Sequence, residues 1–259
     1  MKRRDFLAAS ALAATGPMIQ QASANDKPSG GKEYLELRHY EFASAEKQNA
    51  FEDFLGKAAV PALNRQGVSP VGVFKTEDDK EFDIWVLVPH NSLESIIISN
   101  TKLLADSEFK QAGGDILNCP KSNPSYIRFE SSLLLTFDRC PRVEVPSKKE
   151  SRLFQLRIYE SHNAIMAKRK VEMFNTGGEI DLFRLTGLKP VFFGESIIGS
   201  KMPNLSYMVG FDDADAQKNA WDTFQKHPTW DKLKADPYYK DTVSNITNLV
   251  LRPSVSSQI

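Results

Sequence analysis

A repeated four-residue pattern constrains the fold of this chain more than any other feature. The segment LELRHY, residues 35–40, returns as FQLRIY, residues 154–159, so Leu-Arg-x-Tyr occurs twice at a spacing of 119 residues. A second pair of matching segments follows at nearly the same spacing, GVSPV at 67–71 and GLKPV at 187–191. A period this long excludes short-repeat solenoids and indicates a duplicated domain.

Each half has the residue pattern of strand, helix, strand, strand, helix, strand. In the first half, hydrophobic periodicity and turn residues predict strands and helices in alternation. The strands are expected at 34–42, 70–76, 82–88 and 126–137, and the helices at 44–66 and from 91 onward. The second half repeats this order, although Gly177-Gly178 interrupts its first helix and can split it.

This βαββαβ order is the ferredoxin-like pattern, in which helices cover one face of a four-stranded sheet. We therefore predict an α+β protein of two tandem ferredoxin-like units whose antiparallel sheets pair into an α/β barrel. The expected segments are a signal peptide at 1–24, a flexible leader at 25–33, a first unit at 34–139, a linker at 140–152, a second unit at 153–253 and a tail at 254–259.

The N-terminal segment reads as an export signal. Arg3-Arg4 precedes a short Ala-rich apolar stretch, and the small residues Ala22-Ser23-Ala24 form a cleavage site. This segment resembles a bacterial twin-arginine (Tat) signal peptide and predicts a periplasmic or other extracytoplasmic location. The alternative is a basic, unstructured N-terminus on a cytoplasmic protein. No later segment has the roughly 20 apolar residues that a membrane span requires.

Two cysteines, Cys119 and Cys140, raise the question of a disulfide in an oxidising compartment. The segment between them reads as one long strand, which at about 3.3 Å per residue holds its ends far apart. A disulfide needs Cα atoms within about 7 Å. We therefore predict that the two thiols are not paired.

Strand alternation places Arg38 with Tyr40 on one sheet face and Arg157 with Tyr159 on the corresponding face of the second sheet. The opposite, leucine-bearing faces are expected to pack under the helices. This arrangement would leave both Arg-Tyr pairs in the space between the two sheets.

An arginine in such a space needs a partner, because charged side chains are seldom buried alone. The expected counter-charges are Glu36, Glu41, Glu130 and Glu195. Three interpretations stay open. The groups form an internal network that holds the sheets in register, or they bind an organic ligand through an anionic or carbonyl group, or they face solvent.

Motifs for familiar chemistry are missing from the sequence. The histidines show no metal-ligand spacing, and no Cys-x-x-Cys, phosphate-binding loop or dinucleotide motif occurs. A formal net charge of zero gives no electrostatic footprint for nucleic acid. His227, in KHPTW, is the candidate catalytic residue or haem ligand; alternatively its ring caps a helix. The cluster KRK, 168–170, is interpreted as a solvated helix face.

Three segments together resemble the NIPSNAP family of the dimeric α/β-barrel superfamily. They are the two Leu-Arg-x-Tyr strands, GVSPVGVF at 67–74 and AWDTFQKHPTWDKLKADP at 220–237. The first half lacks the His-Pro-x-Trp element, which favours the second half as the site of function. The resemblance implies sheets paired into a barrel but no settled reaction. Superfamily relatives include cofactor-free monooxygenases and haem proteins such as chlorite dismutase, so either chemistry is an analogy.

From these observations we predict an exported protein that binds a small organic ligand, anionic or carbonyl-bearing, between the two sheets. The expected ligand-binding residues are Arg38, Tyr40, Arg157, Tyr159 and Trp230. Whether the protein is an enzyme stays open, and no metal or other cofactor is expected, with haem as the alternative. Two more functions fit the sequence: an interaction or oligomerisation module with a packed barrel, including a homo-oligomer, and a monooxygenase-like enzyme.

Overall fold

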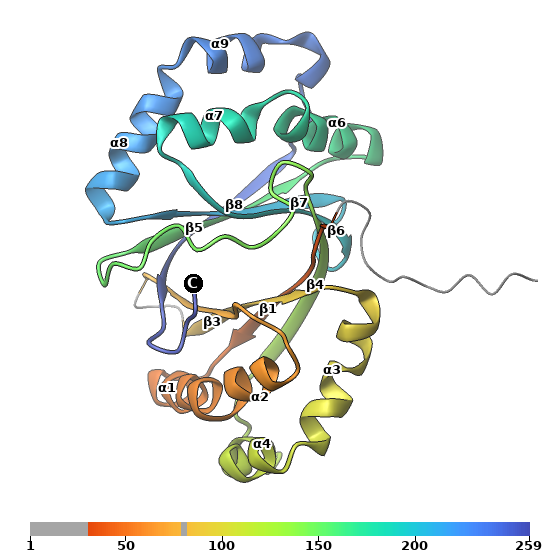
Figure 1. Cartoon of the computed structure of the whole chain (residues 1–259), viewed down its shortest axis with the longest axis vertical. Helices are drawn as coiled ribbons and strands as arrows, with labels where there is room; N and C mark the ends of the chain where they lie inside the picture. The colour runs from red at the N-terminus through yellow and green to blue at the C-terminus, as the bar shows by residue number, and fades with distance from the viewer. Residues whose placement is uncertain (1–30, 79–81) are drawn as a thin grey trace, which may run out of the picture.

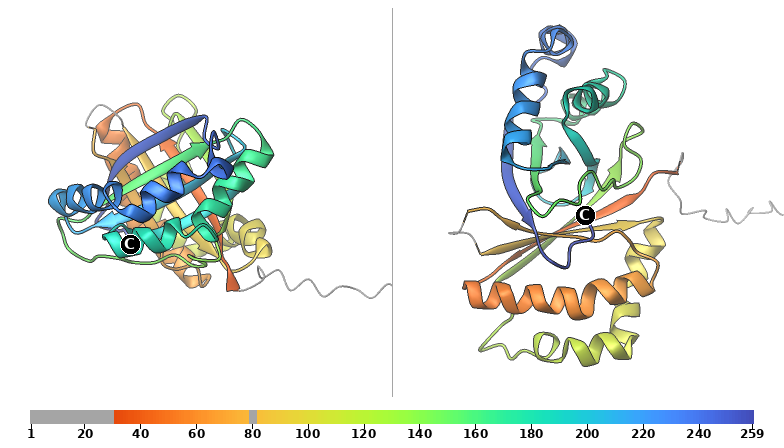
Figure 2. Two further views of the ribbon diagram at one scale, coloured as in Figure 1. Left: turned by 90° about the horizontal axis from the view of Figure 1, so that it is seen from above. Right: turned by 60° about the vertical axis from the view of Figure 1, so that its left-hand side comes forward.

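The computed structural model describes residues 31–78 and 82–259. Eight antiparallel strands close into one barrel, and the helices pack outside it in two groups at opposite ends of the long axis (Figure 1). A turned view shows the barrel between the two helical layers (Figure 2). The predicted signal peptide lies outside the described residues.

The elements alternate in both halves as the sequence pattern predicts. The first half contains β1 (Tyr34–Glu41), α1 (Ala45–Phe54), a π-helical turn η2 (Leu55–Ala59), α2 (Val60–Arg65), β2 (Gly72–Thr76), β3 (Asp83–His90), α3 (Leu93–Ala105), α4 (Ser107–Ala112), α5 (Gly114–Leu117) and β4 (Arg128–Thr136). The second half contains β5 (Leu153–Glu160), α6 (Ala164–Asn175), α7 (Glu179–Thr186), β6 (Lys189–Ile198), β7 (Asn204–Phe211), α8 (Ala214–Gln225), α9 (Pro228–Ala235), a 3₁₀ turn η3 (Pro237–Tyr239) and β8 (Asn245–Pro253).

The strand order shows how the duplicated units meet. The barrel runs β1-β3-β2-β8-β5-β7-β6-β4, so each half keeps the ferredoxin-like order of its own four strands. The halves join edge to edge, β2 with β8 and β4 with β6. The prediction of two tandem units closing an α/β barrel is confirmed. The predicted split of the first helix in the second half is also confirmed, because Gly178 lies between α6 and α7 with φ of 85°.

Three apolar clusters make up the core. One lies under the helices of each half, and the third lies in the barrel interior, which keeps a pocket of about 230 Å³ lined by Leu37, His39 and Glu130 among others. The interior cluster contains Leu35 and Leu37 of β1 and their counterparts Phe154 and Leu156 of β5. Tyr40 and Tyr159 belong instead to the clusters under the helices.

The predicted orientation of the Arg-Tyr faces is therefore wrong. Alternation determines which residues share a face but not which face turns inward. The inside of an eight-stranded barrel is just wide enough for side chains to fill it. Leucine and phenylalanine pack in most of it, and polar side chains such as His39 and Glu130 line a pocket in the rest. The Arg-Tyr faces of both sheets are covered by the helices, and cavities remain between sheet and helices next to the two arginines.

The segment predicted as a tail, residues 254–259, is part of the packed structure. The backbone N–H of Val71 donates to Oε1 of Gln258 at 2.8 Å, and the N–H of Gln258 donates to the Val71 carbonyl at 2.9 Å. The Ile259 side chain enters the barrel-interior cluster and is buried. The segment thus ties the second half to β2 of the first half.

Two further predictions are borne out by the described residues. Cys119 and Cys140 are both free thiols, as the length of the intervening strand indicated. None of the described helices is long and apolar enough to cross a membrane.

Candidate functional site

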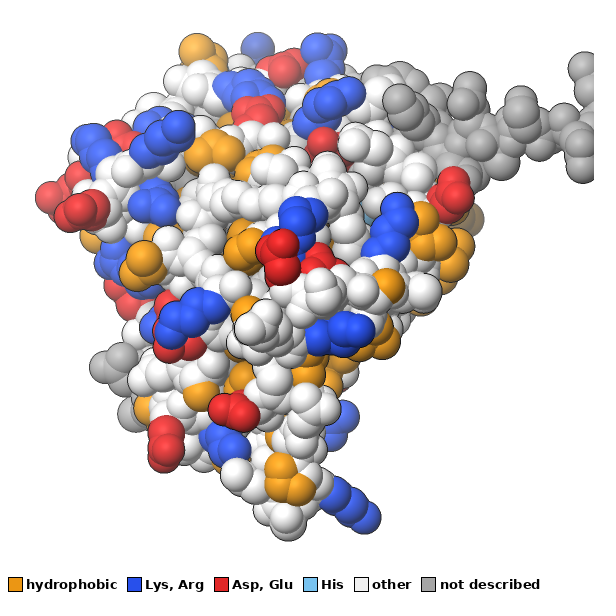
Figure 3. Space-filling view, turned by 60° about the horizontal axis from the view of Figure 1, so that its bottom comes forward, with side chains coloured by type: hydrophobic (Ala, Val, Ile, Leu, Met, Phe, Trp, Pro, Cys, Tyr) orange, Lys and Arg blue, Asp and Glu red, His pale blue; other side chains and the backbone are white. Residues whose placement is uncertain are grey.

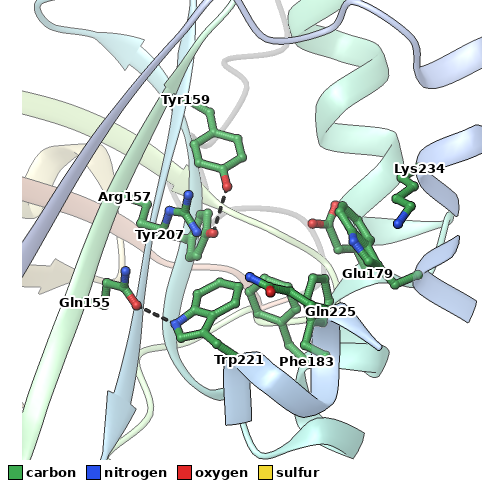
Figure 4. Close-up of a pocket in the computed structure, with 11 residues that line it drawn as sticks. Gln155, Arg157, Tyr159, Glu179, Phe183, Tyr207, Trp221, Gln225 and Lys234 are labelled. Atoms are coloured by element: carbon green, nitrogen blue, oxygen red, sulfur yellow. Dashed lines mark hydrogen bonds between the residues drawn. The ribbon is translucent and has the colours of Figure 1, made fainter. Parts of the chain in front are cut away.

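A cleft of about 650 Å³ opens between the sheet of the second half and its helices α7, α8 and α9 (Figure 4). Arg157, Tyr159 and Trp230, three of the predicted ligand-binding residues, all line it. We call it the Arg157 cleft. Arg38 and Tyr40 lie apart from it, in a separate cavity under the helices of the first half.

Arg157 is held in the cleft by aromatic rings. Its guanidinium carbon lies 5.2 Å from the ring centre of Tyr159 and 5.1 Å from that of Trp221. These distances are typical of cation–π contacts. No described carboxylate pairs with Arg157, and its Nε is buried without a hydrogen-bond partner. The cleft therefore contains a positive charge whose donor groups are not used within the described structure.

Gln155, two residues before Arg157 on the same strand face, fixes one wall of the cleft. Its Oε1 accepts hydrogen bonds from Trp221 Nε1 at 2.6 Å and Gln217 Nε2 at 3.3 Å. Its Nε2 donates to Asn248 Oδ1 at 2.6 Å. Figure 4 shows the bond that orients the indole beside the arginine. Gln155 is neutral, so it positions Trp221 without cancelling the charge of Arg157.

Tyr159 and Tyr207 supply paired hydroxyl groups on the cleft floor. Their oxygen atoms lie 3.2 Å apart, and the rings meet edge to face. Burial raises the pKa of both hydroxyls, so both stay protonated at neutral pH. One of the two hydroxyl protons is used between the rings. The other is available to a ligand.

Glu179, at the start of α7, forms a buried ion pair with Lys170 of α6. Lys170 Nζ lies 2.9 Å from Glu179 Oε2, and both side chains are at most 6% exposed. The ammonium also lies 4.5 Å from the ring centre of Phe174. The interpretation of KRK as a solvated face is thus wrong for Lys170. Because Lys170 neutralises Glu179, this carboxylate does not serve as the partner of Arg157.

The corresponding arginine of the first half has a carboxylate partner. Arg38 donates to Glu36 Oε2 at 2.6 Å, and Ser131 Oγ donates to Glu36 Oε1 at 2.8 Å. Of the four predicted counter-charges, only Glu36 forms an ion pair with either arginine in the described structure. Glu36 and Gln155 occupy equivalent positions of the repeat, 119 residues apart. That single difference leaves Arg157 unpaired.

The structure assigns His227 a local role. Its Nδ1 accepts a hydrogen bond from the backbone N–H of Thr229 at 3.2 Å, which caps α9. His227 is not among the residues that line the Arg157 cleft. The capping alternative is confirmed, and a catalytic role for His227 stays an untested prediction.

The residues of the cleft do not suit haem. The described lining residues include no His, Cys or Met, which leaves Tyr159 and Tyr207 as the available axial ligands. Their hydroxyls bond to each other and are held protonated by burial. Ligation of iron through a phenolate would require breaking that pair.

Three residues that shape the cleft escaped the sequence prediction. The spacing of Tyr207 and Trp221 in the sequence does not distinguish aromatic residues that line a pocket from those of the core. Gln155 did carry a signal. It replaces glutamate within an otherwise repeated strand, and comparison of the two halves can detect that change.

A comparison with known protein families matches the second half of the chain. Residues 154–258 match the NIPSNAP family. The NIPSNAP match contains every residue of the Arg157 cleft. A search of curated proteins found no match.

Some solved structures resemble the chain over most of its length, and others over less than half of it. A candidate monooxygenase from Fusobacterium nucleatum is 10% identical, with 86% of this chain and 93% of that chain covered and a TM-score of 0.57. A candidate monooxygenase from Lactobacillus acidophilus is also 10% identical, with 86% and 94% covered and a TM-score of 0.58. A NIPSNAP family protein of unknown function from Agrobacterium tumefaciens is 18% identical, with 42% and 95% covered and a TM-score of 0.35. At 10% identity, the first two similarities establish the barrel fold alone.

Proposed function

We propose that the protein binds a small organic carboxylate in the Arg157 cleft. The observation that carries the proposal is the unpaired guanidinium of Arg157 among aromatic rings, beside a protonated tyrosine pair. A carboxylate would accept charge-assisted hydrogen bonds from the guanidinium and a further bond from a tyrosine hydroxyl. The same donors would suit the carbonyl oxygen of a neutral ligand, with a weaker interaction.

The body of the ligand is expected to be aromatic or aliphatic. Phe183, Phe224 and Trp230 line the cleft beyond the polar groups. The volume of about 650 Å³ falls within the range of about 300–1,000 Å³ for small-molecule pockets. A few polar groups that fix orientation within apolar walls are typical of such sites.

The proposal includes export by the twin-arginine pathway, on the strength of Arg3-Arg4 and the A-x-A site in the sequence. Replacing Arg3-Arg4 with Lys-Lys in a bacterial host tests it. The protein should then stay in the cytoplasmic fraction, whereas unchanged recovery from the periplasm would exclude this route.

Calorimetric titration with benzoate, phenylacetate and neutral benzamide tests ligand binding. Arg157→Met should abolish binding of the two carboxylates, while Arg252→Met should bind them as the unaltered protein does. Arg252 is a suitable control because it is a surface arginine, paired with Glu77 at 2.6 Å. The proposal fails if Arg157→Met retains carboxylate binding, or if the binding that Arg157→Met removes is as tight for benzamide as for benzoate. It also fails if neither carboxylate binds the unaltered protein, which would favour an interaction module with a packed barrel.

A further inference from the structure

A second cavity, of about 560 Å³, lies under the helices of the first half. It corresponds in the repeat to the Arg157 cleft, with Arg38 and Tyr40 at the positions of Arg157 and Tyr159. We call it the Arg38 cavity. Its walls come from β1, α1, η2, α3, α4, α5, the segment before β4 and the start of β4, so it is separate from the Arg157 cleft.

The charged groups at the floor of the Arg38 cavity cancel. Arg38 and Glu36 are paired at 2.6 Å, and His90 Nε2 lies 3.9 Å from the same carboxylate. Although burial opposes its ionisation, Arg38 holds the pKa of Glu36 below its usual range. Burial lowers the pKa of His90 to about 4, so His90 is neutral at pH 7. One positive and one negative charge remain, and no unpaired cation among the described lining residues is available for an anionic ligand.

Aromatic rings supply most of the contact surface. Tyr40 stacks on Phe129 with ring centres 4.6 Å apart and meets Tyr126 edge to face at 5.5 Å. Phe51 packs against Tyr40 at 4.7 Å. Tyr126 and Phe129, at the rim, are 40% and 43% exposed. Exposed aromatic side chains grouped at the mouth of a cavity are characteristic of ligand sites.

The described residues on the outer face of the first half form no large patch of positive or of negative charge. Figure 3 turns the helices of this half toward the viewer, and its acidic and basic side chains are interspersed among hydrophobic ones. Nothing on this face, as far as the structure describes it, would attract an anion or a cation to the cavity in preference to a neutral molecule.

We propose that the Arg38 cavity is a second binding site, which takes an uncharged aromatic molecule. The duplicated units thus differ in ligand class. The second half presents an unpaired arginine, whereas the first half presents a neutralised arginine within a box of aromatic rings. Arg38 and Tyr40, predicted from the sequence as ligand-binding residues, form the polar floor of this site.

A cysteine at the cavity wall, Cys119, can report whether the Arg38 cavity is occupied. Cys119 lines the wall, and hydrogen bonds with Ser125 lower the pKa of its thiol, which favours the reactive thiolate. Cys140 is fully buried, and burial raises the pKa of its thiol to about 12. Iodoacetamide should therefore alkylate Cys119 in the folded protein and leave Cys140 untouched as an internal control.

The experiment measures the alkylation rate of Cys119 by mass spectrometry, with and without 1-naphthalenemethanol. At ten times its dissociation constant, this neutral probe should slow alkylation about 11-fold. The anionic analogue 1-naphthoate at the same concentration should slow it far less. Equal protection by the two probes, or none by the alcohol, would overturn the proposal.

Two variants show whether protection arises from binding in the Arg38 cavity. Leu103→Trp places a larger side chain at the cavity wall and should remove protection by the alcohol, and circular dichroism shows whether the variant is folded. If it does not fold, the comparison of the two probes on the unaltered protein decides. Arg157→Met should leave protection unchanged, so the Arg38 cavity can fail or succeed independently of the carboxylate site.

Discussion

Changing Gln155 to glutamate should convert the Arg157 cleft into a copy of its first-half counterpart. The new carboxylate would lie two residues before Arg157 on the same strand face, as Glu36 does before Arg38. In the first half this arrangement gives an ion pair at 2.6 Å. The variant should therefore form an internal pair and withdraw the guanidinium from any anionic ligand.

The magnitude follows from the bond that is lost. A hydrogen bond to a charged group contributes about 1.5–3 kcal/mol, and about 1.4 kcal/mol corresponds to a tenfold change in affinity. Affinity for benzoate should then fall by about 10- to 150-fold in Gln155→Glu. The Oε atom that accepts from Trp221 Nε1 is retained. The donor to Asn248 Oδ1 is lost, so the Asn248 amide has to turn and donate its NH₂ to the new carboxylate for folding to be little affected.

Gln225→Glu is the matched control, because Gln225 also lines the cleft but is exposed. An exposed charge contributes about 0.2–1 kcal/mol, so this variant should weaken benzoate binding by about fivefold at most. Fluorescence titration can follow binding, since Trp221 and Trp230 line the cleft. If Gln155→Glu binds benzoate as tightly as Gln225→Glu does, the argument from the unpaired arginine is refuted.

Three further predictions concern stability, each measured by urea unfolding. His227→Ala should lower the free energy of unfolding by about 0.5–2 kcal/mol through loss of the α9 cap, with benzoate affinity unchanged; a lost affinity would instead support a binding role. Lys170→Met should lower the free energy of unfolding by about 3–5 kcal/mol, because Glu179 is left buried and unpaired. Adding Glu179→Gln should restore part of this loss. If the double variant is no more stable than Lys170→Met, the ion-pair explanation is contradicted. The pKa of His90 is about 4 in the folded protein against about 6.5 unfolded, so the unfolded chain binds more protons between these values. The neutral His90 ring contributes fully to the free energy of unfolding above pH 6.5, and this free energy should fall by about 3 kcal/mol as the pH drops to about 4. In His90→Gln the free energy of unfolding should depend less on pH over this range.

The strand and helix order was predictable because it depends on hydrophobic periodicity and turn residues, and both halves of the repeat show the same order of these patterns. Gly177-Gly178 predicted the break between α6 and α7, since a left-handed backbone conformation favours glycine. The face on which Arg38 and Arg157 lie was not predictable in the same way. Strand alternation does not show which face of a strand turns toward the barrel interior. In the closed barrel the leucine-bearing face turns inward, because the limited space there suits these apolar side chains.

The candidate site was predicted only in part for a related reason. Arg157, Tyr159 and Trp230 do meet in one cleft, although the cleft lies under the helices and not between the sheets. The pairing of Lys170 with Glu179 depends on the packing of α6 against α7, which no local pattern encodes. The sequence does record the contrast between Glu36 and Gln155, but its meaning depends on knowing that both residues lie beside an arginine.

The two seams of the barrel, β2 with β8 and β4 with β6, both lie within one chain. Two separate ferredoxin-like subunits would form such a barrel only above their dissociation constant. A covalent connection makes the same pairing intramolecular, at a fixed effective concentration. The integrity of this barrel should therefore be independent of dilution. Each described strand of the barrel has a neighbour on both sides over part of its length, so the barrel offers no fully open edge strand to a second sheet.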